Sequence, residues 1–126
     1  MASQSHTVTT DVTLEIPERH RVLWLKKLFE FTDTEMAHVL GISVETLRKW
    51  LKDETDKHAM DSVRFHCLVT LTQLAKGVIR PSRLGHWVHR ENQALGKLVP
   101  LNLLADAAGY DLVAAIVEDI RAGISD

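Results

Sequence analysis

The feature that most constrains the fold is a pair of short helical segments separated by one glycine, within residues 32–52. Thr32 can cap the first segment, and Glu35 completes a capping box ahead of an apolar run. Gly41 is expected to end this segment, and Ser43 can cap the second one. Two short helices joined by a glycine turn are the layout of a helix-turn-helix.

Apolar residues recur in both segments at the spacing that this layout requires. If Asp33 is the first position of the pattern, Ala37 is the small residue at the helix crossing and Gly41 is the turn glycine. The apolar positions that lock the two helices together are then Met36, Leu40, Ile42, Leu47 and Trp50. The spacing therefore predicts a helix-turn-helix, and the alternative is simply two packed helices.

The second helix is expected to present one polar face outward, because Leu47 and Trp50 turn into the core. Arg48 is the candidate for bidentate contact with a guanine edge, while the two lysines suit phosphates. Ser43 can bond a phosphate or a base, and Glu45 can accept from cytosine. The expected DNA-facing set is Ser43, Val44, Glu45, Arg48, Lys49 and Lys52. The alternative is an ordinary solvated face.

The charge balance limits how such a unit could bind DNA. Lys and Arg number 15 and Asp and Glu number 17, so the formal net charge is −2. This balance argues against a general electrostatic binder of nucleic acid or of acidic membranes. DNA contact must therefore come from a local patch, and modest affinity per subunit favours a homodimer that reads two half-sites of an operator.

Helical periodicity extends over the rest of the 126 residues, so we expect an all-α fold. A first helix is expected over 17–30, because Pro17 suits a first helical turn. A central helix is expected over 61–76, with Asp61 as its N-cap and apolar residues around much of its circumference. Such a helix must be covered on more than one side. It lies either between the DNA-reading unit and the C-terminal part or a second subunit, or at the centre of a monomer.

Breaks in the pattern divide the chain into three parts. Residues 1–16 form a loose arm, in which Val12, Leu14 and Ile16 allow a short strand. The helix-turn-helix and the central helix occupy 17–80, and a small helical unit occupies 81–126.

The C-terminal unit is expected to begin with a helix over 81–90, followed by a turn over 95–100 and a short helix over 101–108. Gly109 would end this short helix, and Asp111 would cap the last one. The residues expected to face inward are Leu84, Trp87 and Val88 in the first helix and Val113, Ile116, Val117 and Ile120 in the last, which ends at Gly123.

Signatures of enzymatic or metal chemistry are weak. Cys67 is the one cysteine, which excludes an intramolecular disulfide and a cysteine zinc cluster and suits a reducing cytosol. His86 and His89 lie one helical turn apart but have no further ligands at zinc spacing, so we interpret them as polar residues that flank Trp87. No apolar run reaches a membrane span, and no Lys or Arg precedes Arg19. We therefore expect a cytoplasmic protein that is not an enzyme and needs no cofactor or metal.

A set of residues in the last third has a recognisable pattern. The set is Trp87, Asn92, Leu95-Gly96, Pro100-Leu101, Leu103-Leu104, Gly109, Val113 and Ile120-Arg121-Ala122-Gly123. In these residues the chain resembles the toxin-binding domain of the Xre/MbcA/ParS antitoxin family, over about 81–126, and the preceding helix-turn-helix is similar to the Xre-like unit that accompanies this domain. One departure is Lys97, where the family commonly has a second glycine.

The resemblance implies an antitoxin of a type II toxin-antitoxin pair whose partner is a RES-domain toxin that depletes NAD. It also implies a homodimer that represses its own operon. In the family the C-terminal segment reaches the entrance of the toxin's active site, and the surface around Trp87 is a further candidate contact. The corresponding C-terminal residues here are Arg121, Gly123, Ile124, Ser125 and Asp126.

The charges of the C-terminal part are compatible with this implication. Acidic residues outnumber Arg121, the one basic residue from Pro100 onward, so an acidic tail with Ile124 as apolar anchor could enter a cationic pocket. The alternative for the tail is a frayed terminus. For the whole chain, the alternatives are a solitary helix-turn-helix regulator that uses the C-terminal fold for dimerisation, and a small enzyme or ligand-binding domain.

Overall fold

A computed structural model describes residues 15–123, and all the regular structure in this range is helical. No strand occurs between these residues, although one isolated bridge pairs Asn92 with Leu98. The predicted all-α class is confirmed. The arm and the short strand expected within 1–16 fall almost wholly outside the described residues.

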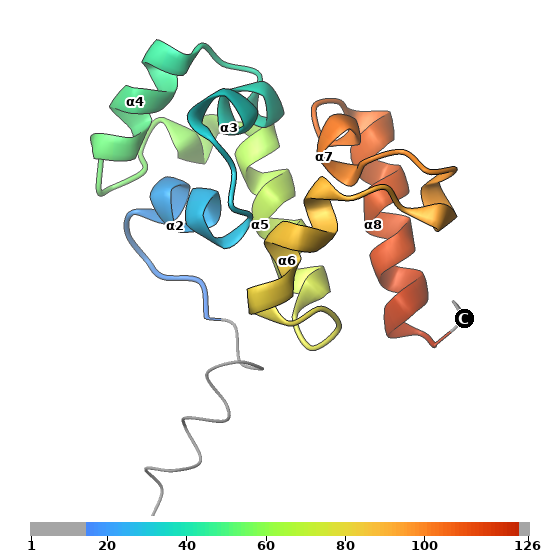
Figure 1. Ribbon diagram of the computed structural model, residues 1–126. Helices are drawn as coiled ribbons and strands as arrows, with labels where there is room; N and C mark the ends of the chain where they lie inside the picture. Colours follow the sequence, from blue (N-terminus) through green and yellow to red (C-terminus); the bar gives the residue numbers. More distant parts are fainter. Residues whose placement is uncertain (1–14, 124–126) are drawn as a thin grey trace, which may run out of the picture.

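Helix α5 is the central element of the molecule, since it contacts α2, α3 and α8. Figure 1 shows α2, α3 and α4 gathered on one side of α5, with α7 and α8 on the other. The expectation that this helix is covered on more than one side is confirmed, and the cover comes from the same chain. The elements are α2 (Arg21–Leu28), α3 (Asp33–Leu40), α4 (Val44–Lys52), η1 (Ala59–Asp61), α5 (Val63–Ala75), α6 (Pro81–His89), η2 (Gln93–Leu95), α7 (Pro100–Leu103) and α8 (Ala107–Arg121).

The core takes apolar side chains from every long helix. Its fully buried members include Leu25, Met36, Leu47, Phe65, Leu68, Leu71, Leu84, Val88, Val113 and Val117. Most of the predicted inward positions are therefore correct. Val63, one of the apolar residues of the central helix, is instead 74% exposed at the start of α5.

The start of α2 differs from the prediction that Pro17 opens this helix. The helix begins at Arg21, and His20 before it has a left-handed backbone and offers no side-chain cap. Asp56, which follows α4, takes that role: its buried carboxylate accepts from the backbone N–H of Arg21 at 3.1 Å and of Val22 at 3.3 Å. A residue 35 positions away thus caps the helix, which local sequence signals cannot reveal.

The start of α8 also differs from the prediction. Gly109 does not end a helix but lies in the first turn of α8, and the N-cap is Asp106, whose carboxylate accepts from the Gly109 N–H at 2.7 Å. Asp111 is therefore not the cap. A Cβ at Gly109 would lie 2.0 Å from the carbonyl oxygen of Leu103, so this glycine allows α7 and α8 to approach closely.

The start of α5 is shifted by one residue. Ser62, not Asp61, is the N-cap, and its hydroxyl accepts from the Phe65 N–H at 3.1 Å. Asp61 belongs to the preceding 3-10 turn. Serine and aspartate are equally good caps, so residue type alone does not favour Asp61 over Ser62.

Candidate functional site

The segment from Thr32 to Lys52 forms two helices whose ends are those predicted. Thr32 accepts from the Glu35 N–H at 3.1 Å, and Glu35 accepts from the Thr32 N–H at 2.9 Å, so the capping box at α3 is confirmed. Gly41 follows α3 with φ of 70°, a left-handed conformation that favours glycine. Ser43 caps α4 by accepting from the Thr46 N–H at 3.0 Å.

Packing between α3 and α4 turns one face of α4 inward. Ala37 is buried on α3, and its carbonyl accepts from the Ile42 N–H, in the link to α4, at 3.0 Å. Leu47 is fully buried, as are Met36 and Leu40 on α3. Ile42 and Trp50 are only half-buried against this core, so Trp50 does not turn as fully inward as its position in the pattern predicts.

Four of the six predicted DNA-facing residues are exposed on α4, namely Glu45, Arg48, Lys49 and Lys52. Val44 is half-buried and packs against the core, so it is less accessible than predicted. The hydroxyl of Ser43 both caps α4 and donates to the Thr46 Oγ1 at 3.0 Å. These bonds hold Ser43 at the helix N-terminus, where a phosphate oxygen would meet the positive end of the helix.

Arg48 forms a weak ion pair with Asp33. Its Nε lies 3.7 Å from the Asp33 carboxylate, which also pairs with the Lys26 ammonium at 3.2 Å. The Arg48 side chain is 64% exposed, and exposed pairs of this kind contribute little free energy, about 0–1 kcal/mol. Arg48 can therefore leave Asp33 for another acceptor at low cost.

Trp87, one of the predicted partner-binding residues of the C-terminal unit, lies at a surface cavity. Trp87 is half-buried rather than turned fully inward, and it lines a cavity of about 330 Å³. The other residues of this cavity are Ile79, Arg83, His86, Arg90, Glu91 and Asn92. Arg90 donates to His86 at 3.1 Å, and the lining combines the Trp87 indole with cationic and amide groups.

Arg121 has a structural contact that the sequence did not reveal. Its guanidinium donates to the carbonyl oxygens of Gln73 and Leu74, at the C-terminal end of α5. This contact fixes the end of α8 against the end of α5. Gly123 follows with φ of 74°, and the predicted tail residues Ile124, Ser125 and Asp126 lie outside the described residues.

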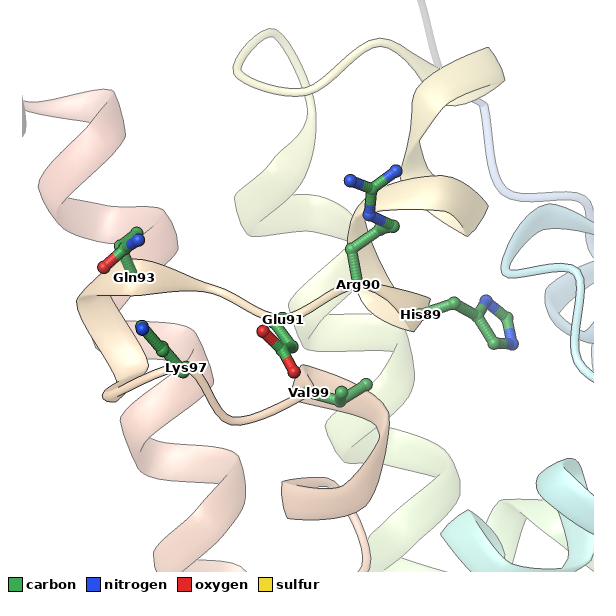
Figure 2. A pocket seen from close by; sticks show the side chains of 6 residues that line it. All are labelled: His89, Arg90, Glu91, Gln93, Lys97 and Val99. Carbon is green, nitrogen blue, oxygen red and sulfur yellow. The ribbon is translucent and has the colours of Figure 1, made fainter.

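The turn after η2 has two consecutive residues with a left-handed backbone. Gly96 has φ of 66° and Lys97 has φ of 70°, so Lys97 adopts a left-handed conformation without being glycine. A polar cavity of about 450 Å³ lies beside this turn, lined by His89, Arg90, Glu91, Gln93, Lys97 and Val99. Figure 2 shows that the imidazole of His89 points away from Lys97 and Gln93.

His89 instead reaches α3. Its Nε2 lies 3.0 Å from Glu35 Oε1, 54 positions away in sequence, and its Nδ1 lies 2.7 Å from the Gly85 carbonyl oxygen. Burial alone would lower the pKa of His89, but the hydrogen bonds to Glu35 and Gly85 and the nearby carboxylates outweigh it and raise this pKa above the ordinary 6.5. Burial likewise opposes ionisation of Glu35, yet the bonds from His89 and Thr32 lower its pKa below 4.5. Our interpretation of His89 as a polar neighbour of Trp87 missed this contact.

Within residues 15–123, no three or more His, Cys, Asp or Glu side chains come together in a way that could hold a metal ion. None of the helices described here is both long enough and apolar enough to span a bilayer. No protein-family model matches the chain, and no curated protein matches it. The antitoxin resemblance therefore rests on the sequence pattern of the chain itself.

Proposed function

We propose that the chain is the antitoxin of a type II toxin-antitoxin pair, which neutralises a RES-type NAD-depleting toxin and represses its own operon. The main support for DNA binding is that α4 has one buried face and one exposed, cationic face. Leu47 is fully buried, whereas Arg48, Lys49 and Lys52 on the same helix are exposed. A helix anchored on one face, with cations on the other, can enter a major groove.

The order of elements around α4 supports a helix-turn-helix. A short helix with a small buried alanine precedes it, and a three-residue link with a left-handed glycine joins the two. Because the molecule is acidic overall, the cations of a single α4 supply limited affinity. Two copies related by a two-fold axis would place two such helices in successive grooves, which is why we propose a homodimer.

The toxin-binding half rests on the resemblance and on the charge of α8. Asp111, Glu118 and Asp119 are exposed on this helix, and Leu112 among them is 54% exposed. An acidic surface with an apolar side chain suits a toxin whose pocket is cationic because it binds the phosphates of NAD. We propose that Trp87, Arg121 and residues 123–126 take part in this contact together with α8.

The test is co-expression with the product of the neighbouring reading frame. We expect a tagged chain to retain this product through purification and to rescue growth when it is toxic. Specific binding to the chain's own promoter, without a toxic or co-purifying partner, would favour the solitary regulator. A chain that neither binds this promoter nor retains a partner would refute both.

A further inference from the structure

We propose that His89 and Glu35 form a proton-dependent link between α6 and α3, which holds the C-terminal unit to the N-terminal helices while His89 is an imidazolium and weakens when that proton leaves. The link goes beyond the proposed function, and its test requires neither DNA nor toxin.

The two ring nitrogens of His89 both face acceptors. The Gly85 carbonyl oxygen, 2.7 Å from Nδ1, has no proton to donate. Glu35 Oε1, 3.0 Å from Nε2, also accepts from the Thr32 N–H at 2.9 Å, as an ionised carboxylate does. Both contacts are hydrogen bonds only if both nitrogens carry protons, so the geometry selects the charged ring.

The other charged groups around His89 differ between its two sides. On the side of α2 and α3, the side chain of Glu30 packs against Gly85, where an added Cβ would lie 2.5 Å from the Glu30 Cδ. The Phe31 ring meets the imidazole edge-on with 5.9 Å between centroids. On the side of the cavity are Arg90, Glu91 and Lys97.

Figure 2 shows the imidazole turned away from the cavity side, and its hydrogen bond to Glu35 directs it toward α3. Two carboxylates, those of Glu35 and Glu30, act on the ring there, and both stabilise its charged form. The 28% exposure of the His89 side chain leaves a path for the proton to exchange with solvent.

Loss of the proton leaves one N–H for two acceptors. If Nδ1 keeps the hydrogen, the lone pair of Nε2 faces the Glu35 carboxylate, and the attraction between α3 and α6 becomes repulsion. Because the pKa of His89 is raised in the folded chain and that of Glu35 is lowered, the link is fully present below pH 6.5 as long as Glu35 is ionised, and it is lost as pH rises through the folded-state pKa of His89. Glu35 also belongs to the capping box of α3, so the change reaches the first turn of that helix.

The direct test is an NMR titration of the histidine ring protons in the full chain, with the His89 signal assigned from its loss in His89→Gln. We expect His89 to titrate above 6.5 in the wild type. Glu35→Gln should move its midpoint downward. Glutamine also completes a capping box, so this variant removes the charge and keeps the cap. A midpoint at or below 6.5, or one that Glu35→Gln leaves unchanged, would overturn the proposal.

A second measurement tests the link itself. We expect amide exchange at Thr32 and in the first turn of α3 to speed up more than the intrinsic rate as the pH rises above 6.5, and this excess to vanish in His89→Gln. His86→Gln is the matched control, since His86 faces the Arg90 guanidinium and not Glu35. If the excess persists in His89→Gln, or is lost equally in His86→Gln, the link is refuted. If Glu35→Gln does not fold, the midpoint of the His89 titration in the wild type, above or below 6.5, still tests the proposal.

Discussion

Replacing Asp56 should destabilise the fold more than its position in a loop suggests. Its carboxylate is buried and accepts from two backbone N–H groups at the start of α2, and it also lies 3.5 Å from the Arg21 Nε. In Asp56→Ala these donors have no acceptor. A lost helix cap costs about 1 kcal/mol and a buried donor without a partner about 1–3 kcal/mol, so we expect a loss of about 3 kcal/mol.

Two further variants separate the carboxylate from other effects. Asp56→Asn keeps one side-chain oxygen and tolerates the left-handed backbone at φ of 57°, so its loss should be smaller, about 1–2 kcal/mol. Asp61→Ala is the matched control, because Asp61 is exposed and caps no helix. Its effect should stay within about 0.5 kcal/mol, as is usual for surface changes.

Urea unfolding followed by circular dichroism measures the free energy of unfolding of each variant. The values can be compared if the dependence of this free energy on urea concentration has the same slope in all variants. A domain of this size is stable by about 5–15 kcal/mol, so a loss of about 3 kcal/mol shifts the midpoint visibly. A difference of less than about 1 kcal/mol between the free energies of unfolding of Asp56→Ala and Asp61→Ala would show that capping by Asp56 does not stabilise the start of α2.

Three further changes test other parts of the structure. Gly109→Ala adds a Cβ 2.0 Å from the Leu103 carbonyl oxygen, so thermal unfolding should show a loss of stability of about 1–3 kcal/mol, although alanine favours helices. A stabilised variant would contradict the close approach of α7 and α8. Lys97→Gly should instead stabilise the chain by up to about 1 kcal/mol, because glycine adopts the left-handed backbone at φ of 70° without the strain that lysine has there. A clear loss of stability would argue against that conformation. Deleting Ile124, Ser125 and Asp126 should weaken growth rescue against the toxin while circular dichroism and operator binding stay unchanged, and equal rescue would move the inhibitory contact to α8 and Trp87.

Local sequence signals predicted the α3–α4 segment well. Thr32, Glu35, Gly41 and Ser43 act on backbone groups within a few residues of themselves, so their roles can be inferred from spacing. The inward positions could likewise be predicted from periodicity, because the residues on one face of a helix recur every three or four positions.

The errors have a different origin, because distant residues decide them. Asp56 sets the start of α2, and the Leu103 carbonyl requires a glycine at position 109 inside α8 rather than after a helix. The contacts of His89 with Glu35 and of Arg121 with the end of α5 join parts of the chain that no periodicity connects. The exposed cations of α4 could thus be predicted, whereas the contacts that fix the C-terminal unit could not.

The most direct test of the proposed function is a gel-shift titration of the promoter fragment upstream of the chain's own gene, with unrelated DNA as competitor. We expect sequence-specific binding that Arg48→Ala weakens by about 1–3 kcal/mol, since Arg48 is exposed on α4 and its ion pair with Asp33 is weak. Arg83→Ala removes an exposed arginine from α6 and should bind as the wild type does. Binding that is not specific, or that Arg48→Ala leaves unchanged, would contradict the assignment of α4 as the DNA-reading helix.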